Sequence, residues 1–253
     1  MQYLYSMFNK NLSFLKRLFS FLVFLMLLSS CNSEFKPATF KITSVNETFE
    51  ADIVVTYDKA TGHSELSETI NASIEKAIIS TLSSSDVKSN LNLVLKDFNT
   101  EFETFKKDFP EATEPVWELN IETELTYQSE DILTIAISTY EFKGGAHGND
   151  KIKFLNLNAK TGAVLNQNDI IDNRNEFKTL AESYFIKSLE TEYKDLKMED
   201  FFFGKPFQLP ENIGFSDDGL VLLYNVYEVA TYDQGYTEFV IPFEEAESNL
   251  KVN

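Results

Sequence analysis

The spacing of apolar residues changes near Pro115, and this change limits the folds open to the chain. Before Pro115, apolar residues recur every three or four positions in two stretches, which predicts two amphipathic helices. The first stretch holds Leu66, Ile70, Ile74, Ile78 and Leu82, and the second holds Leu91, Leu95, Phe98, Phe102, Phe105 and Phe109. Ser64 is placed to cap the first helix, and Pro110 to end the second. A phenylalanine stripe at this spacing is typical of a core, although it would also suit a ligand groove.

After Pro115 the period is two. Residues 117–127 alternate apolar side chains with glutamate and asparagine, which predicts a strand with one buried face and one wet, acidic face. Two further strands are expected at Ile132–Phe142 and Lys151–Asn158, because turn residues separate the three segments. Together they predict an antiparallel meander. An earlier strand is expected at Phe49–Tyr57, where β-branched residues cluster.

In the last third, one helix precedes a hairpin and a closing strand. We expect a helix over roughly residues 174–194, a hairpin of Asn212–Ser216 with Gly219–Val229, and a closing strand at Thr237–Phe243. The Asp-Gly pair at 218–219 is a strong turn signal. The predicted fold class is α+β, with two consecutive lobes in which helices pack on antiparallel sheets.

Charge and composition exclude several classes of function. The chain has 22 basic and 40 acidic residues, a net charge of −18, so it repels phosphate backbones and we expect no nucleic-acid partner. A single cysteine excludes an intrachain disulfide. The only histidines are His63 and His147, and no metal, nucleotide or hydrolase motif occurs. We therefore expect no catalytic residues, no metal ligands and no cofactor.

Residues 1–30 have the features of an export signal. They carry Lys10, Lys16 and Arg17 without an acid, and an apolar run that is short for a membrane span. The run ends in Leu-Ser-Ser-Cys at 28–31, which resembles the bacterial lipobox. This implies cleavage before Cys31, acylation of that residue, and a tether over residues 31–39. The alternative is an uncleaved single-helix anchor. Cleavage would leave 19 basic against 40 acidic residues, a net charge of −21.

A glycine-rich loop interrupts the predicted meander. It contains Gly144, Gly145, His147 and Gly148, and glycines let the backbone approach another surface closely. Such a loop could present His147 to a partner. The alternative is a tight connection in which the imidazole bonds a nearby carbonyl. His63 follows Gly62 at a helix start and is expected to be a solvated turn residue.

Residues 224–236 form the densest tyrosine stretch of the chain. Tyrosine offers rigid contact area with a polar tip, so a loop over Thr231–Tyr236 suits a partner surface. The alternative is that these rings pack on a sheet.

Three segments carry a family resemblance. Residues 139–148 (TYEFKGGAHG) resemble the end of the N-terminal module that precedes the catalytic domain of PdaC-type peptidoglycan deacetylases. Residues 157–162 (LNAKTG) and residues 215–243, from FSDDGL to VIPF, resemble its companion domain of unknown function. The two modules occur together in RsiV-type anti-sigma factors, which bind lysozyme. The resemblance implies modules at 40–149 and 150–253. Deacetylase activity is not implied, because the chain lacks the HxxxH motif of the catalytic domain.

The expected function is binding at the cell envelope. The resemblance, the acidic charge and the tyrosines favour a lysozyme-like cationic protein or a cell-wall ligand as partner, with the chain held by acyl chains on Cys31 in a bacterial membrane. The outer membrane is favoured, and the membrane face stays open. The alternatives are a structural lipoprotein of an outer-membrane assembly and an envelope hydrolase using His147. The residues expected to contact a partner are Gly144, Gly145, His147, Gly148, Tyr227, Tyr232, Gly235 and Tyr236.

Overall fold

The computed structural model describes residues 36–82, 90–112, 115–191, 194 and 196–252. Residues 37–253 form one compact unit, and it holds every helix and strand described below. The expected signal sequence and Cys31 lie outside the described residues. No helix in the described ranges is both long enough and apolar enough to cross a membrane.

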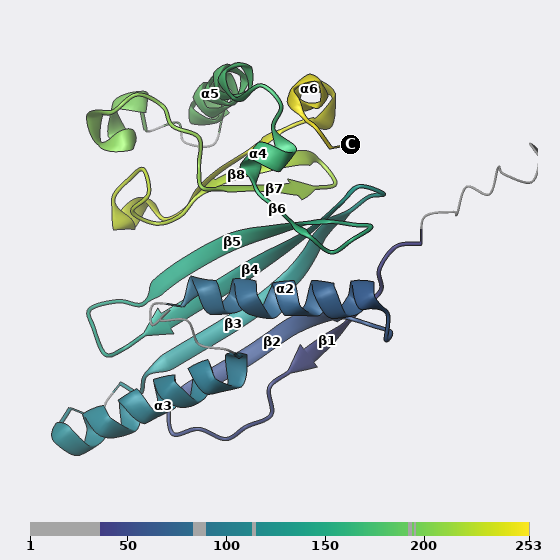
Figure 1. Ribbon diagram of the computed structural model, residues 1–253. Helices are drawn as coiled ribbons and strands as arrows, with labels where there is room; N and C mark the ends of the chain where they lie inside the picture. The colour runs from purple at the N-terminus through teal and green to yellow at the C-terminus, as the bar shows by residue number, and fades with distance from the viewer. Residues whose placement is uncertain (1–35, 83–89, 113–114, 192–193, 195, 253) are drawn as a thin grey trace, which may run out of the picture. The chain divides into compact units, whose positions relative to one another are not determined.

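The larger sheet has six strands in chain order (Figure 1). They are β1 Phe40–Ser44, β2 Asp52–Ala60, β3 Glu118–Gln128, β4 Ile132–Phe142, β5 Asn149–Asn158 and β6 Val164–Leu165. Strands β3, β4 and β5 form the predicted antiparallel meander. Strands β2 and β3 pair in parallel, so this sheet is mixed rather than wholly antiparallel. A parallel pair needs a long crossover, and the two helices between these strands supply it.

Helices α2 (Glu65–Thr81) and α3 (Leu91–Asp108) cover one face of this sheet (Figure 1). The apolar residues at helical spacing turn inward: Ile70, Ile74 and Leu95 are almost fully buried. The Ser64 hydroxyl accepts a hydrogen bond from the backbone of Ser67, so the predicted cap is present. The phenylalanine stripe packs around Trp117 through Phe98, Phe102 and Phe105, with ring centroids 5.3–5.9 Å apart, which places these three against the core. Phe109, at the end of the stripe, is exposed.

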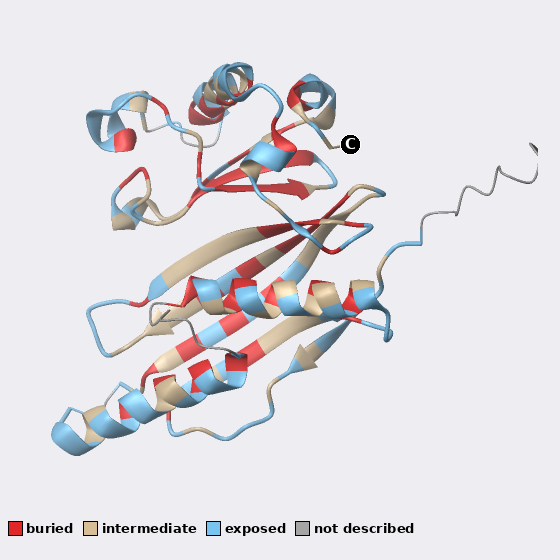
Figure 2. Ribbon diagram, in the orientation of Figure 1, coloured by how far each residue is buried: buried red, intermediate tan, exposed pale blue. Residues whose placement is uncertain are grey.

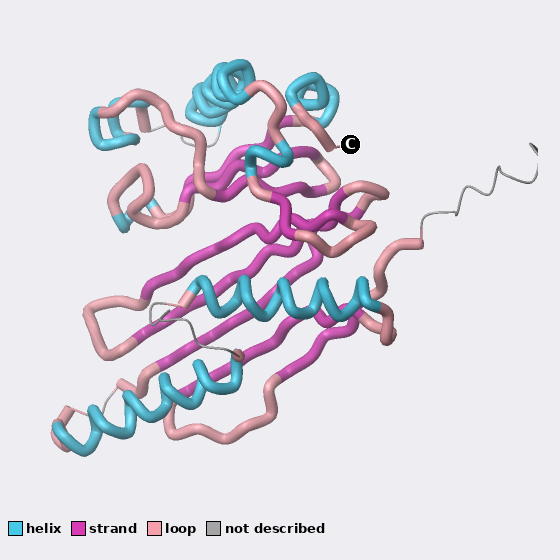
Figure 3. The backbone as a smooth tube through the Cα atoms, viewed as in Figure 1, coloured by secondary structure: helices cyan, strands magenta, loops and turns pink. Residues whose placement is uncertain are grey.

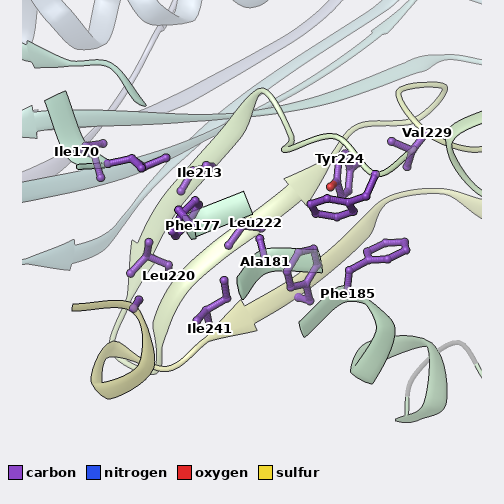
Figure 4. Close-up of a cluster of buried hydrophobic side chains, with 14 of the residues drawn as sticks. Ile170, Phe177, Ala181, Phe185, Ile213, Leu220, Leu222, Tyr224, Val229 and Ile241 are labelled. Atoms are coloured by element: carbon purple, nitrogen blue, oxygen red, sulfur yellow. The ribbon is translucent and has the colours of Figure 1, made fainter. Parts of the chain in front are cut away.

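The smaller sheet is antiparallel in the order β7-β8-β9, and α5 (Arg174–Thr191) packs on it. Its strands are β7 Asn212–Ser216, β8 Gly219–Tyr224 and β9 Thr237–Ile241. Figure 4 shows the shared core, in which the ring of Phe185 points among buried side chains of the sheet. Phe201 and Phe202 are buried in this core, whereas Phe203 is 61% exposed.

Short elements complete the chain. They are α4 Gln167–Ile170, η1 Met198–Asp200, η2 Phe202–Gly204, η3 Tyr232–Gln234, α6 Phe243–Ala246 and η4 Glu247–Asn249. Along the chain, helices and strands follow one another in blocks rather than one by one, and Figure 3 distinguishes the two kinds of element by colour. The α+β class predicted from the sequence is confirmed.

The two sheets meet through polar contacts on the helix-free face of the larger one. The Asn156 amide donates to Ile213 O at 2.8 Å, and the Thr126 hydroxyl donates to Phe215 O at 2.8 Å. Gly214 lies so close to the ring of Phe154 that a Cβ there would come within 2.5 Å of it. Strand β7 therefore covers only one end of this face.

Several predicted boundaries differ from the structure. Strand β1 was not expected, and β2 begins at Asp52 rather than Phe49. The second hairpin strand ends at Tyr224, five residues before the expected Val229, because the chain turns outward and Tyr227 takes a positive φ of 67°. The predicted division at 149/150 stays a prediction; β5 begins at Asn149 and belongs to the larger sheet.

Candidate partner-binding surface

Two loops that are far apart in the sequence meet at one end of the larger sheet. One is the β4–β5 connection with its GGAHG segment, and the other is the β8–β9 connection over residues 225–236. The imidazole of His147 stacks on the ring of Tyr232, with ring centroids 3.9 Å apart and planes 25° apart. The ring of Tyr227 lies next to Tyr232, at 5.6 Å between centroids. We call His147, Tyr140, Tyr227, Tyr232 and Tyr236 the aromatic loop cluster.

The carbonyl of Gly148 joins the two loops. It accepts a hydrogen bond from His147 Nδ1 at 2.9 Å and a longer one from the Tyr232 hydroxyl at 3.4 Å, across 84 residues of sequence. Because a carbonyl oxygen only accepts, Nδ1 carries the hydrogen. Two interpretations of this histidine follow from the sequence, and the one with a tight connection predicts such a bond to a nearby carbonyl. The bond coexists with an exposed ring that stacks on Tyr232.

Gly148 is buried beneath Tyr140. A Cβ at this position would lie 2.1 Å from Cε2 of Tyr140, so only glycine lets the loop come this close to the strand. Gly144 has a φ of 78° and lies against the indole of Trp117. A Cβ at Gly145 would have only one atom within 4 Å, the carbonyl oxygen of His147 at 3.8 Å. Gly235 has a φ of 68° with open space around it, so its role is to turn the chain.

The β8–β9 connection is fastened to the edge of β5 by one side chain. The Asn225 amide accepts from Ile152 N at 2.8 Å and donates to Ile152 O at 3.0 Å, as a neighbouring strand would. The Glu228 carboxylate accepts from the backbone of Asn225 and of Glu211, at 2.8 and 2.9 Å. Burial raises the pKa of Glu228 despite these two bonds. The loop that carries Tyr227 and Tyr232 is therefore held at its base.

The aromatic loop cluster borders a solvent-facing part of the larger sheet. Residues paired across strands share a face, and the register pairs Tyr140 with both Asn120 and Asp150. The same face carries acidic side chains on β2, β3 and β5, and we call this set the acidic strand face. Its members are Asp52, Glu118, Glu122, Glu124 and Asp150.

This face is open to solvent where β7 does not reach it. Asp52, Glu122 and Glu124 are exposed, Val54 between them is 52% exposed, and Figure 2 shows the alternation of exposed and buried residues along β3. The helix-facing partners Val55 and Ile121 are buried. The predicted strand with one wet, acidic face is therefore confirmed.

Burial and the carboxylates of the acidic strand face shift the pKa values of two tyrosines in the aromatic loop cluster. Burial raises the pKa of Tyr236 to about 12, and the charge of Asp150 and the nearby Tyr232 add to the shift. Partial burial also raises the pKa of Tyr140, with further contributions from Glu118 and Asp150. Both tyrosines thus stay neutral donors at physiological pH beside carboxylates.

The structure brings together most of the residues that the sequence singled out. His147, Gly148, Tyr227 and Tyr232 form one contiguous set, and their role in binding stays a prediction. Sequence reasoning missed Asn225 and Asp150 as members of this region, and Tyr140 was quoted only within a motif. The alternation along β4 would have placed Tyr140 on the acidic side of the sheet.

No candidate metal centre accompanies His147 within the described residues. No group of three or more histidine, cysteine, aspartate or glutamate side chains there is arranged to hold a metal ion. The Nδ1 atom of His147 bonds a backbone carbonyl, whereas the corresponding nitrogen of a Ser-His-Asp triad bonds a carboxylate.

Comparison with known proteins gives two family matches and a set of similar solved structures. Residues 42–150 match the family model described as deacetylase PdaC, and residues 165–244 match the one described as a protein of unknown function, DUF3298. No curated protein matches the chain.

Two of the similar solved structures are those of DUF3298 family proteins. One is from Bacteroides fragilis NCTC 9343, with 18% identity and a TM-score of 0.66, and the other is from Pseudomonas aeruginosa PAO1, with 21% identity and a TM-score of 0.63. Each comparison covers 85% of this chain and 95% of the other, and at these identities it shows a shared fold. The two matched families are consistent with a cell-envelope protein. The chain carries a PdaC-type segment followed by a DUF3298 segment, which confirms the tandem pair that the sequence resemblance predicted.

Proposed function

We propose that this chain is a lipid-anchored, non-catalytic binding protein of the cell envelope, whose partner is a cationic protein. The observation that carries the proposal is the position of the aromatic loop cluster at the border of the acidic strand face. Tyrosine rings supply contact area at little entropic cost, and the carboxylates beside them supply charge complementarity.

The aromatic loop cluster combines both matched segments. His147 belongs to the PdaC-type segment and Tyr232 to the DUF3298 segment. A partner that contacts the stacked pair therefore touches both, which gives a physical reason for their occurrence in tandem. The resemblance to RsiV-type proteins makes a c-type lysozyme the first partner to test, because lysozyme is cationic and acts on the cell wall.

The test is a calorimetric titration of residues 32–253 with a c-type lysozyme at low salt and at about 0.15 M salt. This segment contains the whole compact unit, residues 37–253. We expect saturable one-to-one binding that persists at the higher salt. A cationic protein of similar size without wall activity, such as cytochrome c, should bind only at low salt. Absence of lysozyme binding at the higher salt would refute lysozyme as the partner.

Matched aromatic substitutions locate the surface. Tyr227 is 56% exposed in the cluster, and Phe109 is 58% exposed at the end of α3. We expect Tyr227→Ala and Tyr232→Ala each to weaken binding at least about tenfold, as central interface tyrosines do, while Phe109→Ala leaves the affinity unchanged. An unchanged affinity in Tyr227→Ala and Tyr232→Ala would place the contact elsewhere.

The membrane anchor has its own test. With Cys31 acylated, the chain should fractionate with membranes and carry the added mass of its acyl chains, since stable anchoring takes more than one chain. Cys31→Ser should release the protein into the soluble fraction. Retention of Cys31→Ser in the membrane would favour the uncleaved helical anchor instead.

A further inference from the structure

A cleft of about 680 Å³ lies away from the aromatic loop cluster and shares no residue with it. One wall comes from α2, the floor from β5, and the opposite wall from the β6–α4 stretch, the start of α5 and the segment that leads into β7. Its volume is within the range of pockets that hold small organic ligands.

The cleft has a net positive lining, whereas the chain as a whole is strongly negative. Its lining includes three cations, Lys76, Lys153 and Arg174, and one acid, Glu211. The whole chain has nearly two acidic residues for each basic one. None of the three cations forms an ion pair within the described part of the chain. An excess of unpaired positive charge in a concave region is where an anion gains most from binding.

Hydrogen bonds to neutral acceptors hold two of these side chains. Lys153 Nζ donates to the Ser80 hydroxyl at 2.7 Å, and that hydroxyl donates to Ala77 O at 2.7 Å. Arg174 Nη1 donates to Gln167 Oε1 at 3.0 Å. An ammonium has three donors and a guanidinium five, so each head keeps donors for a ligand while its position is fixed.

Gln167 is fixed in turn on the far wall. Its amide nitrogen donates to the carbonyls of Pro210 and Glu211, at 2.7 and 3.2 Å. The head of Arg174 is thus positioned by a chain of two side-chain contacts that ends at the backbone, which lowers the entropic cost of binding an anion.

Lys153 lacks a counter-charge that would offset its burial. Burial lowers the pKa of its ammonium, the neighbouring Lys151 lowers it further, and Glu211 opposes the shift only in part. A bound anion would favour the charged form, so the pKa of Lys153 must rise when the cleft is filled.

The remaining lining suits an apolar group. Ala77, Leu165 and Leu209 contribute to the walls, and both leucines are only partly buried by the protein's own core. We propose that this cleft binds an organic anion, a carboxylate or phosphate attached to an apolar group, with Lys76, Lys153 and Arg174 around its charged head.

Calorimetry on residues 32–253 with octyl phosphate and octanoate, below their micelle-forming concentrations, tests the proposal. We expect saturable binding of at least one of them at one site per chain, and the preferred one tells whether the head is a phosphate or a carboxylate. Octanol and inorganic phosphate should each bind at least about tenfold more weakly, because each lacks one half of the ligand. Octanol or inorganic phosphate binding as tightly as the octyl anions would overturn the proposal, as would no binding of either anion.

Substitutions assign the binding to the cleft. Lys153→Gln and Arg174→Gln should each weaken binding at least about tenfold, and exposed Lys107→Gln on α3 should not. Saturation with the octyl anion should also raise the Lys153 pKa, followed by the side-chain 13C shift in an NMR titration. An unchanged affinity in the double variant Lys153→Gln/Arg174→Gln, or an unmoved Lys153 pKa in the complex, would refute the assignment. The charges of the cleft and the tyrosines of the other surface can be varied separately, so either proposal can fail alone.

Discussion

At the scale of single residues, the two loops depend on close approaches that few side chains allow. Gly148 lies under the ring of Tyr140, and its carbonyl is the acceptor that His147 and Tyr232 share. Gly145 lies in the same loop but would place a Cβ no nearer than 3.8 Å to another atom. Packing therefore requires glycine at position 148, whereas position 145 has room for a side chain.

Gly148→Ala should force the Tyr140 ring aside and lower the free energy of unfolding by about 1–3 kcal/mol, the usual cost of overpacking. Urea unfolding of the two alanine variants measures this loss. Gly145→Ala should stay within about 0.5 kcal/mol of the parent chain. If both variants unfold alike, the tight contact with Tyr140 does not constrain the loop.

The pKa of Tyr236 reports the charge at the border of the cluster. Burial and then Asp150 raise it to about 12, so removing the carboxylate in Asp150→Asn should lower the pKa while burial keeps it above the ordinary value near 10. NMR of 13C-labelled tyrosine across the alkaline range measures the shift. Asp169→Asn, on α4, is the matched control and should leave Tyr236 unmoved. An unchanged Tyr236 pKa in Asp150→Asn would contradict the contact between loop and strand face.

At the scale of elements, an asparagine side chain takes the place of a strand. Asn225 satisfies both backbone groups of Ile152 at the edge of β5, and Asn212 Oδ1 accepts from Phe154 N at 3.3 Å beside it. An uncovered edge would invite pairing with another chain. These two side chains close the edge and attach the second sheet to the first.

Asn225→Ala should cost about 1–3 kcal/mol of stability, because it leaves a half-buried donor and acceptor of Ile152 without partners. It should also weaken lysozyme binding, because the β8–β9 connection that carries Tyr227 and Tyr232 would lose its attachment to β5. Asn175→Ala on the exposed side of α5 is the control. Thermal unfolding and the titration together test the point, and full affinity in Asn225→Ala would show that the loop is positioned without this clamp.

The elements also show what the sequence alone can predict. The two early helices follow from apolar spacing, and the meander follows from alternation with turn residues between strands, because these signals are local. The parallel pairing of β2 with β3 leaves no local signal, since it depends on how the two helices cross over. Likewise, the GGAHG and tyrosine loops were each singled out, but their contact spans 84 residues and could not be predicted from either loop.

At the scale of the compact unit, acidic and basic side chains gather in different places. Carboxylates lie together on the acidic strand face, and three cations without an ion pair among the described residues line the cleft. A surface of one sign steers an oppositely charged partner before any contact forms, and this shows in the association rate and its dependence on salt. The net charge of −18 alone would attract a cation to any side of the molecule.

Two pairs of substitutions with equal change in net charge separate these effects. Glu122→Gln/Glu124→Gln removes two charges from the acidic strand face, and Glu111→Gln/Glu190→Gln removes two exposed charges outside it. Stopped-flow association with lysozyme at low salt should slow by about twofold to tenfold in the first pair and change little in the second. The dissociation rates should change less than the association rates, because exposed charges act mainly on encounter. Raising the salt to about 0.15 M should shrink the difference as screening sets in. Equal slowing in both pairs would mean that the partner responds to total charge, and the acidic strand face would then have no special part in encounter.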